Sequence, residues 1–226
     1  MDKHRVYNLI ILDESGSMES IKSATISGFN EVVQTIKEVE RQFPEQEHYV
    51  SFITFNGMGV KTLLDKRSVL ELTEIDGNSF KPNASTPLYD AIGFAAGALN
   101  NYLSNQTNFN VLVTILTDGE ENASREFNGN QISQLINGLK PHGWTFTYIG
   151  ANQDVEKVAA SLNIENRMQF AANDEDMKRM FEEKKEARML YSMKLRNKEN
   201  VQCNYYRDKD KKDKAKRNSN DVKLHR

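Results

Sequence analysis

Two short apolar runs have the composition of strands that are buried on both faces. Residues 6–12 read VYNLIIL and residues 111–116 read VLVTIL, and an aspartate follows each run within two positions. Continuous apolar segments of this length suit the interior strands of a parallel sheet, because helices cover both faces of such a sheet. We therefore expect both segments to be central strands.

Between these runs the apolar spacing changes to that of helices. Residues 20–43 place apolar side chains three and four positions apart, and Pro44 ends the segment. Residues 86–103 open with Thr-Pro, and proline is well tolerated at a first helical position. The same reasoning predicts helices at residues 131–139, 155–162 and 173–194.

The remaining strands complete the pattern of one sheet. Residues 49–55 alternate, and Asn-Gly then turns the chain into residues 60–64, which predicts a hairpin. Shorter strands are expected at residues 144–149 and 167–171. Strands alternating with helices predict an α/β fold: a doubly wound, mostly parallel six-stranded sheet with one antiparallel edge strand and helices on both faces.

Charge divides the chain into an acidic body and a basic end. Residues 178–226 hold 17 Lys and Arg against 8 Asp and Glu, although the whole chain has a formal net charge of −2. After about residue 198 the apolar periodicity stops, and residues 207–217 read RDKDKKDKAKR. Such a run cannot bury enough apolar area to offset the entropy of ordering. We expect one domain over residues 1–197 and a basic, flexible tail over 198–226.

Composition argues against several classes of protein. Cys203 is the only cysteine, so an internal disulfide is impossible and a zinc site built on cysteines lacks ligands. No apolar stretch approaches the roughly 20 residues of a membrane span. The early apolar run is also too short for a secretion signal. The expectation is a cytoplasmic protein of bacterial type.

Candidate chemistry gathers where the two apolar runs end. The first run leads into Asp13, Ser15 and Ser17, and the second leads into Asp118. Ligands of open α/β sheets bind beyond the carboxyl ends of the strands, where the strand order reverses. If the two strands are neighbours there, the two carboxylates face each other. Thr86, at the start of the next helix, adds a third hydroxyl.

These five side chains offer only oxygen atoms. Hard oxygen ligands favour Mg²⁺, Mn²⁺ or Ca²⁺ over zinc or copper. Few carboxylates and several hydroxyls suggest that the ion keeps some waters, which favours octahedral Mg²⁺ over a calcium cage. The alternative for the first segment alone is that its serines and aspartate only cap a helix.

The motifs that carry these residues resemble those of a known family. D-x-S-G-S after the first strand, T-P-L-Y-D-A-I at the start of the middle helix and T-D-G-E after the central strand are similar to the metal-ion-dependent adhesion site of von Willebrand factor type A domains. The resemblance covers roughly residues 5–194 and fills all five expected positions.

The resemblance implies a role for each of these residues. Ser15, Ser17 and Thr86 would touch the metal, and Asp13 and Asp118 would act directly or through waters. An open position on the ion would accept a carboxylate from a partner protein. The function expected from the sequence is thus a metal-dependent protein–protein interaction module.

Neighbouring residues have plainer interpretations. Asp90 is expected on the surface of its helix, and the residues that follow the strands are expected in solvated loops, with contact to the site as the alternative. Those loop residues are Glu120, Glu121, Asn122, Asn152 and Gln153. Core positions are expected for Phe94, Leu99 and Tyr102.

Nothing in the sequence supplies an enzyme's machinery, so we expect a protein without catalytic activity. No histidine lies near the two serines to activate a nucleophile, and no phosphate-binding glycine motif is present. Two alternatives stay open. The basic tail could bind nucleic acid, with Tyr205 and Tyr206 available for stacking, although interspersed aspartates weaken that interpretation. A metal-dependent phosphohydrolase is the other alternative.

Overall fold

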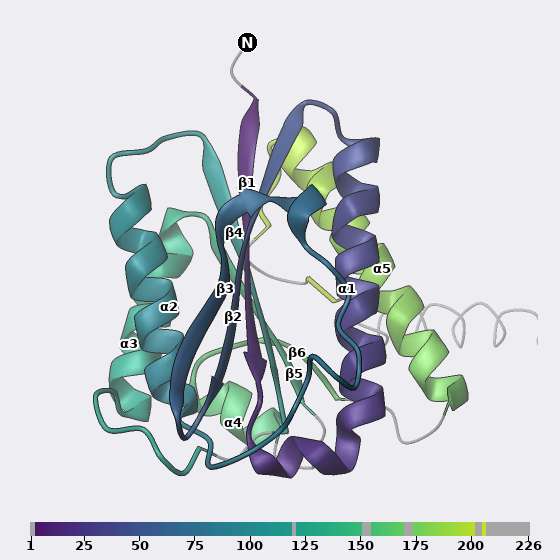
Figure 1. Cartoon of the computed structure of the whole chain (residues 1–226). Helices are drawn as coiled ribbons and strands as arrows, with labels where there is room; N and C mark the ends of the chain where they lie inside the picture. Colours follow the sequence, from purple (N-terminus) through teal and green to yellow (C-terminus); the bar gives the residue numbers. More distant parts are fainter. Residues whose placement is uncertain (1–2, 119–120, 151–154, 170–173, 202–204, 207–226) are drawn as a thin grey trace, which may run out of the picture.

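The described part of the chain holds six strands and five α-helices, which alternate except where two consecutive strands form a hairpin (Figure 1). The computed structural model describes residues 3–118, 121–150, 155–169, 174–201 and 205–206, and within residues 174–181 it describes the backbone alone. The strands are β1 His4–Asp13, β2 Gln46–Asn56, β3 Gly59–Ser68, β4 Phe109–Thr117, β5 Trp144–Gly150 and β6 Asn166–Gln169. The helices are α1 Lys22–Gln42, α2 Leu88–Leu103, α3 Gly129–Leu139, α4 Val155–Ser161 and α5 Asp174–Arg196.

All six strands form one sheet in the order β3-β2-β1-β4-β5-β6. Every neighbouring pair is parallel except β2 and β3, which form the antiparallel hairpin at one edge. The predicted fold class is therefore confirmed. The sheet order reverses at β1, whose neighbours are β2 on one side and β4 on the other, and β1 and β4 are the two apolar runs of the sequence.

Helices cover both faces of this sheet, with α2 and α3 on one side and α1 and α5 on the other (Figure 1). Alternate residues of β1 feed the two cores. Leu9 and Ile11 join the cluster beneath α2 and α3, whereas Ile10 and Leu12 join the cluster beneath α1. All four are buried, so β1 is the doubly covered strand that its uninterrupted apolar sequence predicts.

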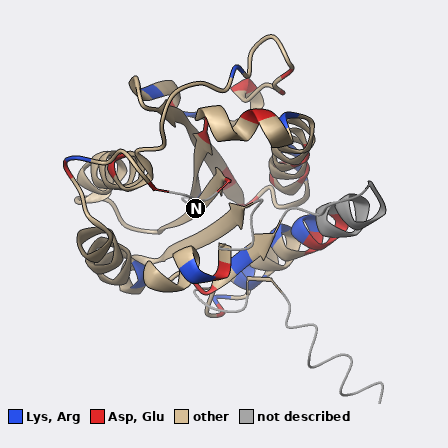
Figure 2. Cartoon of the chain, turned by 90° about the horizontal axis from the view of Figure 1, so that it is seen from below, with Lys and Arg blue, Asp and Glu red and all other residues tan. Residues whose placement is uncertain are grey.

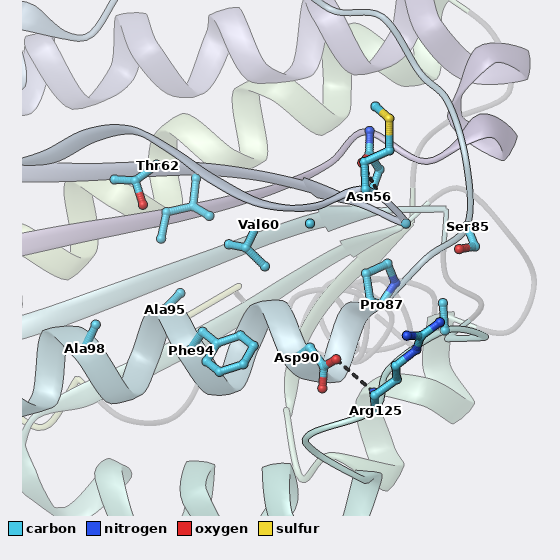
Figure 3. Close-up of a pocket in the computed structure, with 15 residues that line it drawn as sticks. Asn56, Val60, Thr62, Ser85, Pro87, Asp90, Phe94, Ala95, Ala98 and Arg125 are labelled. Carbon is cyan, nitrogen blue, oxygen red and sulfur yellow. Dashed lines mark hydrogen bonds between the residues drawn. The ribbon is translucent and has the colours of Figure 1, made fainter.

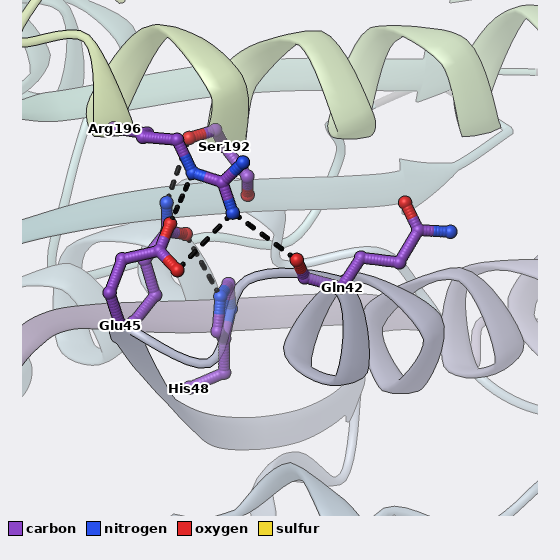
Figure 4. Close-up of polar contacts among 6 residues, drawn as sticks. Gln42, Glu45, His48, Ser192 and Arg196 are labelled. Carbon is purple, nitrogen blue, oxygen red and sulfur yellow. Dashed lines mark hydrogen bonds and ion pairs between the residues drawn. The ribbon is translucent and has the colours of Figure 1, made fainter.

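The last helix is held partly by polar contacts. Arg188 of α5 is buried and donates to the Asn8 side chain at 2.6 Å. At the end of the helix, Arg196 forms an ion pair with Glu45 at 2.6 Å and donates to the Gln42 carbonyl at 3.2 Å (Figure 4). Residues of both charges occur along this helix (Figure 2).

Packed residues extend beyond position 198, where the apolar periodicity of the sequence stops. Val201 and Tyr205 are buried in a small cluster beneath α5. The Tyr205 backbone N–H donates to the Asn166 side chain at 3.0 Å, and the Val201 carbonyl accepts from the Thr145 hydroxyl at 3.1 Å. Residues 207–226, which hold the charged run, lie outside the described residues.

Two details of the middle helix differ from the sequence interpretation. Pro87 occupies the position before the first helical residue rather than the first helical position. Leu99 is buried as expected, but the core assignment of Phe94 and Tyr102 is wrong, because each is 47% exposed. Within the described residues, no helix is both long and apolar enough to cross a membrane.

Shortening Leu9 to alanine should test the importance of the doubly covered strand. Leu9 is fully buried, so Leu9→Ala removes apolar contacts and leaves a cavity, and the free energy of unfolding should fall by about 2–5 kcal/mol. Leu63→Ala on the exposed edge strand should change it by no more than about 0.5 kcal/mol. Urea unfolding of both variants measures this difference, and equal losses would contradict the assignment of the core.

Candidate metal-binding site

Parallel pairing of β1 with β4 brings the two predicted acids to the same edge of the sheet. Leu12 is in register with Leu116, so both strands end within a residue or two of each other. Asp13 is the last residue of β1 and is fully buried, and Asp118 follows β4 with 4% of its surface exposed. The two carboxylates interact: burial raises the pKa of Asp13, and the charge of Asp118 adds a smaller increase.

Two hydrogen bonds hold the Asp13 carboxylate in place. Its Oδ1 accepts from the Ser15 backbone N–H at 2.7 Å, and its Oδ2 accepts from the Thr117 hydroxyl at 2.6 Å. Burial nevertheless raises the pKa of Asp13 from 3.8 to about 6, with the nearby Asp118 adding to the effect. No Lys or Arg side chain in the described part of the chain forms an ion pair with Asp13.

The loop after β1 brings two hydroxyls together. The side-chain oxygens of Ser15 and Ser17 lie 3.1 Å apart. Ser15 is fully buried, whereas Ser17 is exposed. A short 3-10 helix, Gly16–Ile21, begins directly after Ser15, yet the Ser15 side chain makes no capping hydrogen bond to it. The helix-capping alternative therefore lacks the contact that defines it.

Thr86 reaches this edge through the segment that precedes α2. The Gly16 backbone N–H donates to the Ala84 carbonyl at 2.8 Å, which ties this segment to the serine loop. Thr86 is buried, with 2% of its surface exposed. Its backbone N–H donates to the Asn122 side chain at 2.9 Å, and its carbonyl accepts from the Asn122 backbone at 3.1 Å.

Acidic residues around the site brace its loops. Asp90 does not lie on the helix surface as expected. It is 8% exposed, and its carboxylate accepts three backbone N–H groups of residues 125–127 at 2.8–3.0 Å. The Glu121 carboxylate likewise accepts from the Tyr89 backbone at 2.9 Å and from the Ser124 hydroxyl at 2.6 Å. These contacts fix the loop after β4 against the start of α2. Glu120, Asn152 and Gln153 lie outside the described residues.

Two residues that interact with the acids were not predicted as site residues, although Thr117 belongs to the T-D-G-E motif. Thr117 is the last residue of β4, and its hydroxyl orients Asp13. Tyr148 of β5 is fully buried, and burial together with the charges of Asp13 and Asp118 raises the pKa of its phenol. Periodicity marks both only as strand residues. Their polar roles depend on neighbours that are distant in the sequence.

The donor set fits a hard divalent cation. Two carboxylates and the serine hydroxyls gather at one edge, Thr86 is tied to the same loops, and every side-chain donor is oxygen. Among the described residues, no three His, Cys, Asp or Glu side chains lie together in a way that could hold a metal ion. A site with only two carboxylates would therefore depend on its hydroxyls for the remaining protein ligands.

Comparison with known proteins gives the family and the fold. The chain matches the family model of the von Willebrand factor type A domain over residues 9–187. No curated protein matches the chain. Two solved structures of proximal thread matrix protein 1 from the mussel byssus are similar at 13% and 12% identity, with TM-scores of 0.51 and 0.50.

These alignments cover 80% of this chain but only 45% and 46% of the byssus protein. The chain thus spans less than half the length of that protein. At such low identity, the likeness shows a shared fold alone. The family model, in contrast, covers most of the chain, including the end of β1 from Leu9 onward, all of β4 and the segments that follow both strands. The chain therefore belongs to the von Willebrand factor type A domain family.

Proposed function

We propose that this domain binds one divalent cation, preferably Mg²⁺, and uses it to hold an acidic group of a partner protein. The observation that carries the proposal is the buried Asp13 carboxylate. It lies beside Asp118, its pKa is raised, and no basic side chain among the described residues compensates its charge. An uncompensated buried carboxylate is costly, and a bound cation would remove that cost.

Each residue would have a distinct task at the ion. Ser15, Ser17 and Thr86 would offer neutral hydroxyl oxygens, and Asp13 and Asp118 would supply the charge. Mn²⁺ and Ca²⁺ are also compatible with such a donor set. The two carboxylates together carry the charge that balances one divalent ion. If the ion contacts them partly through waters, that negative charge lies further from it, and the ion would still attract an external carboxylate.

The proposed partner is a protein because domains of this family generally mediate protein–protein interactions. Ser17 is exposed, so a partner carboxylate could approach the proposed site from solvent beside it. A carboxylate bound to a metal at a partly buried site resists screening by salt better than an exposed ion pair does.

The alternatives gain no support from the described residues. Tyr205, which was a candidate for stacking on bases, is 6% exposed and packs against Tyr191. Nucleic-acid binding would therefore have to rely on the charges of the tail. A phosphohydrolase remains a separate hypothesis that turnover of generic phosphoesters would test.

Removing the charge of the buried carboxylate should weaken cation binding strongly. Asp13→Asn keeps the side-chain size but loses the charge, so the affinity for Mg²⁺ should fall roughly 100-fold or more. Isothermal titration calorimetry measures this loss, with Asp65→Asn as the matched control because Asp65 is exposed on β3. Unchanged Mg²⁺ affinity in Asp13→Asn would show that the ion binds elsewhere.

Acidification should weaken cation binding through the same group. The folded protein holds a proton on Asp13 up to about pH 6, whereas the unfolded chain releases it near 3.8. The contribution of Asp13 to the stability of the metal-free protein therefore falls as pH rises from about 3.8 to about 6, and the cation, which needs the ionised carboxylate, should offset this loss increasingly as the pH rises. Thermal unfolding should show a larger Mg²⁺-induced rise in Tm near pH 7.5 than near pH 5. An equal rise at both pH values would contradict the role of Asp13.

Partner capture should depend on the cation and on Asp118. In a nuclease-treated lysate of the source organism, the wild-type chain should retain its partner in Mg²⁺ and release it in EDTA, and Asp118→Ala should retain none. Mass spectrometry identifies the proteins captured by the wild type in Mg²⁺, by the wild type in EDTA and by Asp118→Ala. Partners that ignore both EDTA and the substitution would place function on another face or in the tail.

A further inference from the structure

A groove of about 660 Å³ lies between the β2–β3 hairpin and helix α2 (Figure 3). Its walls are mostly apolar. Val60 of β3 and Phe94 of α2 face it from opposite sides, and Met58 comes from the hairpin turn. These three residues are 36%, 47% and 76% exposed, respectively. Large apolar side chains gathered at an open groove are typical of a site for another molecule.

The Phe94 ring is held in its exposed position. It meets the Phe127 ring edge-on, with the ring centres 5.4 Å apart. Phe127 is in turn fixed by its backbone hydrogen bond to Asp90. The Asp90 carboxylate also holds the loop of the proposed metal site, so the same side chain positions both this wall of the groove and that loop. A ring positioned in advance loses little entropy when a ligand covers it.

One end of the groove adjoins the proposed metal site. Ser85 and Pro87 line the groove, and Thr86 lies between them in the chain. Ala84, one residue earlier, accepts a hydrogen bond from Gly16 of the serine loop. A chain that bound the cation through a carboxylate could therefore continue into the groove without crossing another element.

Charge favours an acidic ligand. Arg125 lines the groove, and its guanidinium forms no ion pair with any side chain that the structure describes. The acidic residue of the groove, Asp90, is engaged by three backbone N–H groups. The residues 207–226 of this chain are rich in Lys and Arg, which is the wrong charge for this position.

We propose that the groove binds an extended acidic segment of the partner protein. One carboxylate of the segment reaches the cation, a large apolar side chain near it packs between Val60 and Phe94, and a second carboxylate pairs with Arg125. This inference rests on the proposed function and adds the sequence class of the partner: acidic residues flanking an apolar one.

A peptide library provides the direct test. Phage-displayed peptides with a fixed Glu among random positions are selected against the full chain in Mg²⁺, and the affinities of synthetic copies are measured by fluorescence anisotropy. Selected peptides should carry a large apolar residue at a constant distance from the Glu. Phe94→Ala should weaken them roughly tenfold, and Arg125→Gln should weaken only those with a second acid.

Tyr102→Ala is the matched control, because Tyr102 lies on the same helix with the same exposure but outside the groove lining. It should leave the affinity unchanged. Val60→Ser repeats the test from the opposite wall, and circular dichroism checks that each variant folds. A double-mutant cycle between Phe94 and the apolar residue of the peptide should show coupling.

The outcomes separate this inference from the proposed function. Peptides that need Mg²⁺ and Asp118 but ignore Phe94, Val60 and Arg125 would overturn the inference and leave the proposed function standing. If Mg²⁺ binds the chain but no acidic peptide is selected, the partner class is wrong and the inference fails with it. If calorimetry detects no Mg²⁺ binding at all, the proposed metal site itself is wrong.

Discussion

The buried end of β1 is the constraint around which the site is arranged. Because β1 is covered on both faces and pairs with β2 and β4, its last residue, Asp13, is fully buried. The backbone of Ser15 and the hydroxyl of Thr117 fix this carboxylate and thereby fix the serine loop against β4. Burying a charge at this position destabilises the chain on its own. Binding of the proposed cation would offset that cost.

Much of this architecture could be predicted from the sequence because it depends on local patterns. Uninterrupted apolar runs predicted that β1 and β4 are interior strands, and apolar residues three and four positions apart predicted the helices between them. Together these patterns predicted the order of elements and the fold class. The acids at the ends of the two runs were expected to meet if those strands were neighbours, and the sheet order confirms that they are. Whether the five oxygen-bearing residues bind a metal is still a prediction.

Other features could not be predicted because they depend on contacts between distant residues. Asp90 has the spacing of a surface position, yet it is buried by a loop that lies 35 residues further along the chain. Phe94 is a large apolar residue of the kind that usually lies in a core, yet it is exposed. The neighbouring hairpin does not pack against it, and a groove lies between them. Both errors lie beside the proposed site, where loops decide burial and periodicity carries little information.

The most direct test of the account is a crystal structure of the chain with Mn²⁺, which scatters anomalously and replaces Mg²⁺ at oxygen sites. The account predicts one strong anomalous peak at the carboxyl edge of the sheet, within coordination distance of Ser15, Ser17 and Thr86 and close to Asp13 and Asp118. A fully occupied peak elsewhere, or none at this edge at saturating Mn²⁺ and neutral pH, would contradict the metal-dependent function proposed for this domain.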